Sequence, residues 1–288
     1  MTTPSLAVPA HDASPQATIT DRLSEFPWWV LFILFSAAIL VFNFATNATY
    51  GEVLNNLIAG VRLTVFVTLT AYAFAISLGL ITALGQLSPR VSVRNVATLY
   101  VQIIRGVPII VQIFYTALVI VPAAVAGANA LGVRLADAGI LGVDNALVAL
   151  SIRDVDFVTR GIIALAISYG AFSSEIFRAG IQSIEKGQLE AAQSLGLSRL
   201  QSLRLIILPQ AVRRVLPPLG NDFIAMLKES SLVSVLGVDE VTHLSRKYAA
   251  ASFRYVPTYN TLAFIYLSMT LVLSMGVKFM ERKLKTAE

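Results

Sequence analysis

The chain alternates between long apolar segments and shorter polar segments, and this alternation is the strongest pattern in the sequence. A helix needs about 20 predominantly apolar residues to cross the hydrocarbon core of a membrane. Six segments meet or approach that length: residues 26–51, 63–89, 95–121, 161–184, 217–236 and 255–277. The pattern predicts an all-α integral membrane protein with six transmembrane helices.

Prolines indicate where these helices bend or begin. Pro108 lies inside the third segment and lacks the backbone donor that would bond to the Ile104 carbonyl, so we expect a kink there. Pro217 and Pro218 open the fifth segment, and proline is tolerated in the first turn of a helix. We therefore expect the fifth helix to begin near residue 217.

The polar segments are predicted to lie outside the membrane. Residues 1–25 are rich in Thr, Ser, Ala and Pro, which is typical of a disordered tail. Residues 123–160 mix Gly, Ala, Asp and Arg, and we expect an outer loop with a short surface helix near residues 147–152. Residues 237–254 form a second expected outer loop.

The first apolar segment has two interpretations, a retained helix and a cleaved signal peptide. A signal peptide has a basic start and an apolar region of about 7–15 residues. Residues 26–51 are longer than that, and they follow Asp21, Arg22 and Glu25. The sequence therefore favours a retained transmembrane helix.

Basic residues predict the orientation of the chain, because cytoplasmic loops of membrane proteins carry an excess of Lys and Arg. With the amino terminus inside, the inner segments contain Arg90 and Arg94, the basic residues of 186–214 and the basic carboxyl-terminal segment. The two outer loops mix acids with bases. Both termini are therefore predicted to be cytoplasmic, and residues 1–25 to form a cytoplasmic tail.

Composition supports this fold class and excludes several functions. Of 288 residues, 56% are hydrophobic and 14% are charged, and the mean hydropathy is +0.72. The net charge of +5 comes without a basic cluster interleaved with aromatic residues, so nucleic acid is not an expected partner. The chain has no cysteine, no metal-ligand spacing and no phosphate-binding Gly-Lys loop. It is therefore expected to be neither an ATPase nor another enzyme.

Residues 187–209 form a polar segment between apolar ones. A narrow stripe of apolar and small residues recurs there at spacings of three and four: Leu189, Ala192, Gly196, Leu200, Leu203 and Ile207. Gly196 weakens a helix at its centre, and Pro209 interrupts helical hydrogen bonding. The stripe predicts two short helices with a bend, lying either on a partner protein or on the bilayer surface.

This segment resembles the EAA loop of the membrane subunits of ATP-binding-cassette importers. The resemblance rests on Glu190-Ala191-Ala192, Gly196 and the later Leu208-Pro209 pair. Residues 99–112, 168–180 and 216–234 are similar to the polar amino-acid branch of that family. The similarity covers roughly residues 52–284, so residues 26–51 are expected to be an extra helix before a five-helix core.

The resemblance implies a permease subunit in a bacterial inner membrane. The loop would dock on a cytoplasmic ATPase through Glu190, Ala191, Ala192, Gly196, Leu208 and Pro209. Further implied partners are a second permease chain, identical or related, and a solute-binding protein outside the membrane. The chain itself would hold no cofactor, since ATP and Mg²⁺ belong to the partner ATPase, and the substrate would be a polar amino acid.

Charged residues inside the predicted spans need a partner, a cavity or an interfacial position, because each costs about 2.5–3.5 kcal/mol on insertion scales. Glu175 and Arg178 are three residues apart and can form a structural ion pair. Asp222 and Glu229 share one helix face, and Asn221 and Lys228 share a neighbouring face. A zwitterionic amino acid needs both signs of charge along its route.

We therefore hypothesise a translocation path or gate, with a buried structural network as the alternative. Its candidate residues are Arg105, Gln112, Tyr169, Ser173, Asn221, Asp222, Lys228 and Glu229. The neutral members can equally serve as interhelical hydrogen bonds.

Two functions from other classes remain as alternatives. The first is a secondary amino-acid transporter driven by an ion gradient. Such transporters usually contain inverted repeats, and no motif of this chain occurs twice. The second is a membrane scaffold without transport activity, which the charges of the fifth span disfavour.

Overall fold

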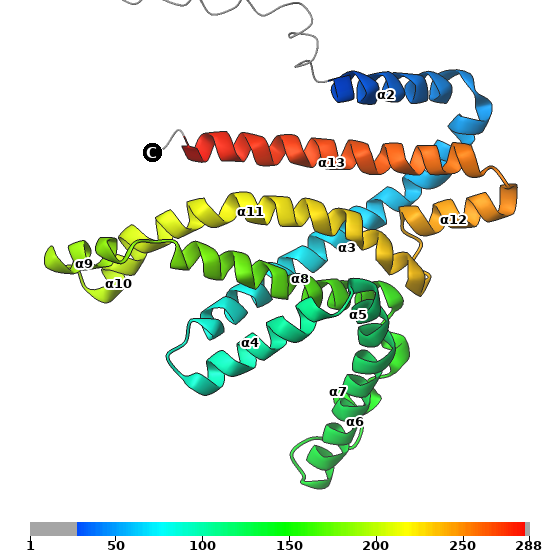
Figure 1. The fold of residues 1–288 in the computed structure, drawn as a ribbon. Coiled ribbons are helices and arrows are strands. Elements are labelled where there is room, and N and C mark those ends of the chain that lie inside the picture. The colour runs from blue at the N-terminus through cyan, green and yellow to red at the C-terminus, as the bar shows by residue number, and fades with distance from the viewer. Residues whose placement is uncertain (1–27, 286–288) are drawn as a thin grey trace, which may run out of the picture.

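The structure, a computed structural model, describes residues 28–285, and within these residues it contains helices and no strands (Figure 1). The first helical elements are α2 (Trp28–Thr46), α3 (Ala48–Gln86), α4 (Val91–Gly106), α5 (Ile109–Tyr115), the π-turn η1 (Thr116–Ile120), α6 (Val121–Asp137), α7 (Ala146–Ala149) and the 3-10 turn η2 (Ile152–Asp154). They are followed by α8 (Phe157–Gln182), α9 (Lys186–Ser194), α10 (Arg199–Ser202), the π-turn η3 (Leu203–Ile207), α11 (Leu208–Glu229), the 3-10 turn η4 (Ser230–Leu236), α12 (Val241–Ser252) and α13 (Tyr255–Lys285). The predicted tail, residues 1–25, lies outside the described residues.

Four helical stretches are long and apolar enough to cross a membrane. They are Ala48–Gln86, Ile109–Asp137, Phe157–Gln182 and Tyr255–Leu284, and Val30–Thr46 is a shorter apolar helix. The all-helical membrane fold is thus confirmed. The count of six spans stays a prediction, because the apolar part of α2 is short and α11 carries five charged residues.

Two helices extend beyond the predicted spans. Helix α3 begins at Ala48, where the Asn47 side chain accepts the Thr49 N–H at 2.9 Å. Its first turns tolerate polar residues because they are exposed, and Glu52 pairs with Arg254 at 2.7 Å. Residues 121–137, at the start of the predicted loop 123–160, form α6, whose alanines favour a helix. The short surface helix expected near residues 147–152 corresponds to α7 and η2.

The expected start of a helix near residue 217 is wrong. Helix α11 begins at Leu208 and contains Pro217 and Pro218 in its interior. The π-turn η3 precedes it, and the Leu208 N–H bonds to the Leu203 carbonyl. Membrane helices tolerate proline in their interior where neighbouring groups satisfy the freed backbone carbonyls. The second expected loop, residues 237–254, likewise contains a helix, α12.

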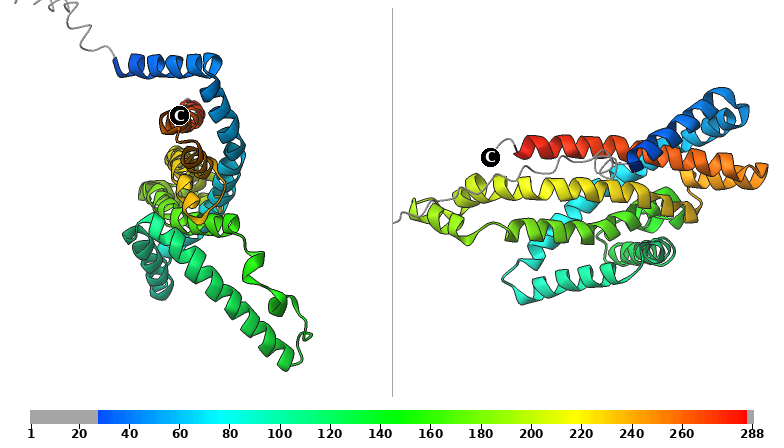
Figure 2. Two further views of the ribbon diagram at one scale, coloured as in Figure 1. Left: turned by 90° about the vertical axis from the view of Figure 1, so that its right-hand side faces the viewer. Right: turned by 45° about the horizontal axis from the view of Figure 1, so that its top comes forward.

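Helix α8 is the centre of the bundle. Helices α3, α4, α5 and α11 all pack against it, and α3 crosses it obliquely (Figures 1 and 2). Small residues allow the close crossing, because a Cβ atom on Gly79 would lie 2.9 Å from the Cβ of Ser173. The buried core joins Ala71 of α3, Leu165 of α8 and Met226 of α11. A displacement of α8 therefore alters its packing against all four of these helices.

Different helices and turns lie at the two ends of the bundle. Helices α9 and α10, the α3–α4 turn and the carboxyl-terminal end of α13 lie at one end, on the left of Figure 1. Helix α12 and the α2–α3 turn lie at the other end, and the second view of Figure 2 shows the same arrangement. The hairpin of α6 and α7 projects away from the bundle. The polar segment 187–209 thus forms one extremity of the molecule.

The helix is interrupted at Pro108, where a kink was predicted. Val107 is extended, with φ −114° and ψ 136°, and α5 starts after Pro108. The buried Gln112 side chain satisfies backbone carbonyls that the break leaves free. Its Nε2 donates to the carbonyls of Ile104 at 2.7 Å and Val107 at 2.6 Å. Its Oε1 accepts the Ser168 hydroxyl at 2.6 Å. Gln112 therefore joins both halves of the break to α8.

Glu240 joins α12 to α3 and α13 at the other end. The side chain is 1% exposed. One carboxylate oxygen accepts the His243 N–H at 2.7 Å, and the other accepts the hydroxyls of Tyr266 at 3.2 Å and Thr64 at 3.4 Å. Burial raises the pKa of Glu240 above its ordinary value of 4.5.

We expect Gln112→Leu to lower the free energy of unfolding in detergent by about 2 kcal/mol or more. Leucine fills a similar volume but leaves the two carbonyls without a donor, and each unsatisfied buried group costs about 1–3 kcal/mol. Gln102→Leu is the matched control, because Gln102 is an exposed glutamine on α4. Equal stability of the two variants would contradict this role of Gln112.

We expect the stability of the protein to fall as the pH rises above about 4.5, through the raised pKa of Glu240. The unfolded chain releases this proton at lower pH than the folded chain, so ionisation favours unfolding. Glu240→Gln removes the titration, and its amide can keep bonds to the His243 N–H and the Tyr266 oxygen. Thermal unfolding across this pH range should show a shallower decline for Glu240→Gln than for the exposed-site control Glu185→Gln. Parallel declines would show that Glu240 does not titrate as argued.

Candidate functional site

The 187–209 loop folds as two short helices with a bend, as its stripe of small and apolar residues predicted. Gly196 lies at the bend with φ +78°, a backbone conformation that side chains disfavour. The Leu197 N–H bonds to the Ala192 carbonyl at 3.1 Å, which closes α9 in a Schellman motif. Ser198 and Gln201 then cap α10 reciprocally at 3.3 and 2.9 Å.

The loop presents apolar side chains to its surroundings. Leu195 is 80% exposed and Leu200 is 73% exposed. Ala192 is buried in the loop, whereas Glu190 and Ala191 are exposed on α9. Leu208 and Pro209 are exposed where η3 meets α11. The six predicted coupling residues thus lie on one compact segment at the end of the bundle (Figure 1).

Four of the predicted path residues meet in a seam between α8 and α11. The Ser173 hydroxyl donates to Asp222 Oδ2 at 2.9 Å, and the Tyr169 hydroxyl donates to Glu229 Oε2 at 3.0 Å. Ser173 is fully buried and Tyr169 is 2% exposed. Each acid of α11 is therefore held by a neutral donor of α8, and this α8–α11 seam carries two carboxyl groups.

Asn221 and Lys228 lie beside the seam on the exposed side of α11. The Asn221 amide donates to the Pro217 carbonyl of its own helix at 3.2 Å. Lys228 is exposed, and its ammonium has no hydrogen bond or ion pair to any residue of the described range 28–285. The seam and its rim together present both signs of charge.

The remaining two candidates lie apart from the seam. Arg105 approaches Glu175 at 3.7 Å, and Arg178 binds the same carboxylate at 2.6 Å. Gln86 of α3 also donates to Glu175, at 3.1 Å. Gln112 bridges the α4–α5 break. These contacts are structural ties between helices in the isolated chain.

Several polar contacts in the structure could not be predicted from local patterns in the sequence. Arg160 is 9% exposed and donates to the carbonyls of Val155, Ala117 and Ile152. The Tyr100 hydroxyl donates to the Ile167 carbonyl at 2.6 Å. Arg160 and Glu240 both lie in the predicted outer loops, where charged side chains are usually exposed to water. Among residues 28–285 no three His, Cys, Asp or Glu side chains gather as possible metal ligands.

Known proteins are similar to this chain in sequence and in fold. Residues 75–286 match the family described as binding-protein-dependent transport system inner membrane component. The glutamine transport system permease protein GlnP of Escherichia coli K12 is 31% identical over 229 residues, which cover 80% of this chain and 93% of GlnP. The probable amino-acid permease protein YxeN of Bacillus subtilis is 34% identical, over 78% of this chain and 90% of YxeN.

A solved structure agrees with these relatives. A chain in the crystal structure of an amino acid ABC transporter with histidines is 33% identical, with a TM-score of 0.66 over 83% of this chain and 98% of that chain. The family match begins inside α3, so α2 lies before it. The match includes the whole loop 187–209 and the α8–α11 seam. The chain belongs to the family of binding-protein-dependent transport system inner membrane components.

Proposed function

We propose that this chain is the permease subunit of an ATP-driven importer of polar amino acids, and that substrate passes along the α8–α11 seam. The family match over residues 75–286 carries the transport part of this proposal. The amino-acid part is supported by the names of the relatives, which include glutamine, cystine and arginine transport permeases. The chain itself contributes no ATP-binding loop, so a separate ATPase that uses ATP and Mg²⁺ is required.

The loop 187–209 is the proposed contact with that ATPase. Exposed apolar side chains at a bundle end, such as Leu195 and Leu200, are unfavourable in water and are typical of a surface that a partner covers. The left-handed Gly196 keeps the bend free of a side chain. Glu190, Ala191, Ala192, Leu208 and Pro209 complete this proposed coupling surface.

The rim of the seam is the proposed substrate route. A lysine on a membrane helix is expensive unless it faces water or a partner. Lys228 is exposed and its ammonium has no hydrogen bond or ion pair within the described residues, so we infer that its side chain faces an aqueous path shared with a second permease subunit. Its positive charge and the carboxylates of Asp222 and Glu229 complement the two charged groups of a zwitterion. Asn221, Tyr169 and Ser173 add hydrogen-bonding groups, while Arg105 and Gln112 keep the surrounding helices in place.

We also propose the remaining partners and the orientation, and the arrangement of the bundle ends supports them. The end with the coupling loop also holds the α3–α4 turn and the carboxyl-terminal end of α13 (Figure 1). Arg90 belongs to that turn and the end of α13 is basic, so we propose that this end and both termini are cytoplasmic. The opposite end, with α12, would meet a solute-binding protein outside the membrane. A second permease chain, identical or related, would complete the path.

An ion-driven secondary transporter is the alternative function. The coupling loop distinguishes the two, because a self-sufficient transporter has no need for an exposed apolar docking surface. Uptake that follows ATP rather than the ion gradient would support the importer.

We expect Leu200→Asp to reduce recovery of the ATPase at least about ten-fold, because it places an unpaired charge in an apolar contact. The measurement is affinity purification of the tagged chain from native membranes in mild detergent, followed by ATP hydrolysis of the eluate. Val143→Asp is the matched control, since Val143 is an 81% exposed valine of the α6–α7 hairpin. Gly196→Asp, at the bend, should behave like Leu200→Asp. Unchanged recovery with both loop variants would reject this docking surface.

We expect Asp222→Asn and Lys228→Gln to lower amino-acid uptake at least about ten-fold, because each removes one charge that complements the substrate. Uptake is measured with the complete importer in proteoliposomes, with Lys278→Gln as the control for an exposed lysine on α13. Thermal unfolding is recorded for each variant. Full uptake with a lowered unfolding temperature would assign these residues to a structural network instead.

A further inference from the structure

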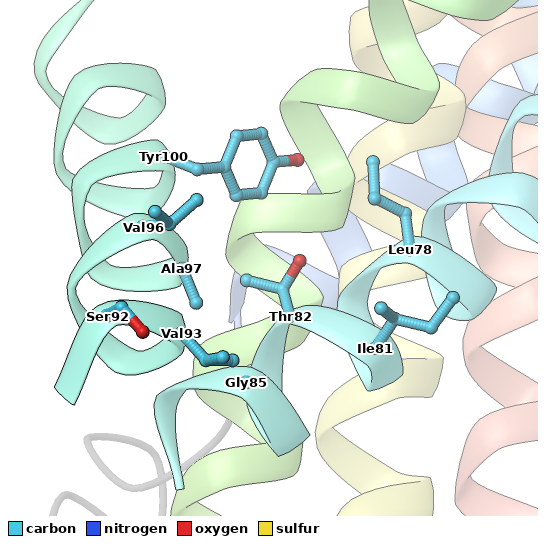
Figure 3. Close-up of a pocket in the computed structure, with 9 residues that line it drawn as sticks. All are labelled: Leu78, Ile81, Thr82, Gly85, Ser92, Val93, Val96, Ala97 and Tyr100. Atoms are coloured by element: carbon cyan, nitrogen blue, oxygen red, sulfur yellow. The ribbon is translucent and has the colours of Figure 1, made fainter. Parts of the chain in front are cut away.

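A groove lies between the carboxyl-terminal part of α3 and the first turns of α4, with a volume of about 510 Å³. Figure 3 shows its lining: Leu78, Ile81, Thr82, Gly85, Ser92, Val93, Val96, Ala97 and Tyr100. The groove is open along one side. It belongs neither to the seam nor to the coupling loop.

The walls of this α3–α4 groove are almost entirely apolar. The two helices meet closely at its floor, since a Cβ atom on Gly85 would lie 3.0 Å from the Cβ of Ala97. Tyr100 turns its ring toward the groove in Figure 3, while its hydroxyl is already bonded to the Ile167 carbonyl at 2.6 Å. The lining residue Val96 is 70% exposed, and the apolar surface continues outside the groove over Leu99, which is 59% exposed. A hydrocarbon chain fits such walls, and a polar ligand does not.

Two arginines stand at the closed end of the α3–α4 hairpin. Arg90 precedes α4 and Arg94 follows one turn later, next to the lining residue Val93. Both are exposed, and neither has an ion pair with another residue of 28–285. The sequence from Val53 to Ala136 contains no Asp or Glu, so α4 and α5 offer no acid to them. Glu175 of α8, which accepts a hydrogen bond from Gln86, is already paired with Arg105 and Arg178. The positive charge at the groove's end is thus uncompensated along this stretch of the chain.

We propose that the α3–α4 groove binds an acyl chain of an anionic phospholipid whose phosphate lies between Arg90 and Arg94. The pairing of an apolar channel with basic residues at one end matches the two parts of such a lipid. A helix of a second permease copy would match the apolar walls but not the two arginines. The proposal does not depend on the transported substrate or on ATP.

The expected consequence is selectivity for the headgroup. A basic side chain near an anionic lipid strengthens binding by about five-fold, so two should favour an anionic over a zwitterionic phospholipid by about thirty-fold. Ordinary lipid contact with an apolar helix gives no such preference. Selectivity at the groove, rather than lipid contact itself, is therefore the quantity to measure.

A tryptophan at the rim of the groove can report on the bound lipid. The reporter is Val96→Trp in a full-length chain with Trp28→Phe and Trp29→Phe, and the control reporter is Met275→Trp, at a 70% exposed position of α13. Each is reconstituted in phosphatidylcholine vesicles with increasing amounts of dibrominated phosphatidylglycerol or dibrominated phosphatidylcholine, which quench tryptophan on contact. We expect the groove reporter to be quenched at about thirty-fold lower phosphatidylglycerol than phosphatidylcholine, and the control reporter to show no preference.

Charge variants test the role of the arginines. Arg90→Gln with Arg94→Gln should remove the preference for phosphatidylglycerol at the groove reporter. Lys278→Gln with Lys283→Gln removes the same charge from the same end of the molecule and should leave that preference unchanged. Equal quenching by both lipids in the parent reporter, or an unchanged preference in the arginine variant, would overturn the proposal. Absence of quenching at the groove with normal quenching at Met275→Trp would show that protein covers the groove and would overturn it too.

A second measurement needs no tryptophan reporter, so it tests the proposal even if the Val96→Trp variant does not fold. Wild-type chain purified in mild detergent should retain phosphatidylglycerol detectable by mass spectrometry, and the arginine double variant should lose it while the lysine double variant does not. Equal retention by all three proteins would overturn the proposal.

Discussion

The close approach of helix backbones along α8 is the constraint on which the rest of the structure depends. Small residues permit it, most clearly at Gly180, where an added Cβ atom would lie 2.2 Å from Val215 of α11. Membrane helices gain little from burying apolar surface against one another, so close packing and interhelical hydrogen bonds hold them together. The contacts of α8 with α3 and α11 supply both, and they fix the register in which the polar side chains meet.

The register between α8 and α11 brings polar residues of the two helices together in the seam. Ser173 and Tyr169 are one turn apart on α8, and their partners Asp222 and Glu229 are two turns apart on α11. Each carboxyl group receives a neutral donor instead of a cation, so the positive charge of Lys228 stays available on the exposed side. A site that held its own charges in internal ion pairs would offer less to a charged substrate.

Local patterns in the sequence were enough to predict the apolar helices, the bend at Gly196 and the interruption at Pro108, because each depends on nearby residues. The sequence did not reveal that α11 begins at Leu208, because the helix continues through Pro217 and Pro218, and prolines are more usual at a helix start. The acidic residues of α11 could be predicted to lie in a membrane helix, but their hydrogen-bond donors on α8 could not be predicted. Those partners lie 49 and 60 residues away, and only the packing of α8 brings them close.

The connectivity of the chain links the proposed coupling surface to the proposed path. Helix α8 enters the loop at Gln182 and α11 leaves it at Leu208, so the loop joins the same two helices that form the seam. A force on α9 and α10 therefore acts on both walls of the seam at once. Close packing at Gly180 near that end resists compression of the helices, so their displacement as rigid bodies is the easier response. Such a displacement would act on the Ser173–Asp222 and Tyr169–Glu229 bonds, which makes the seam the natural place for an ATPase movement to open or close the path.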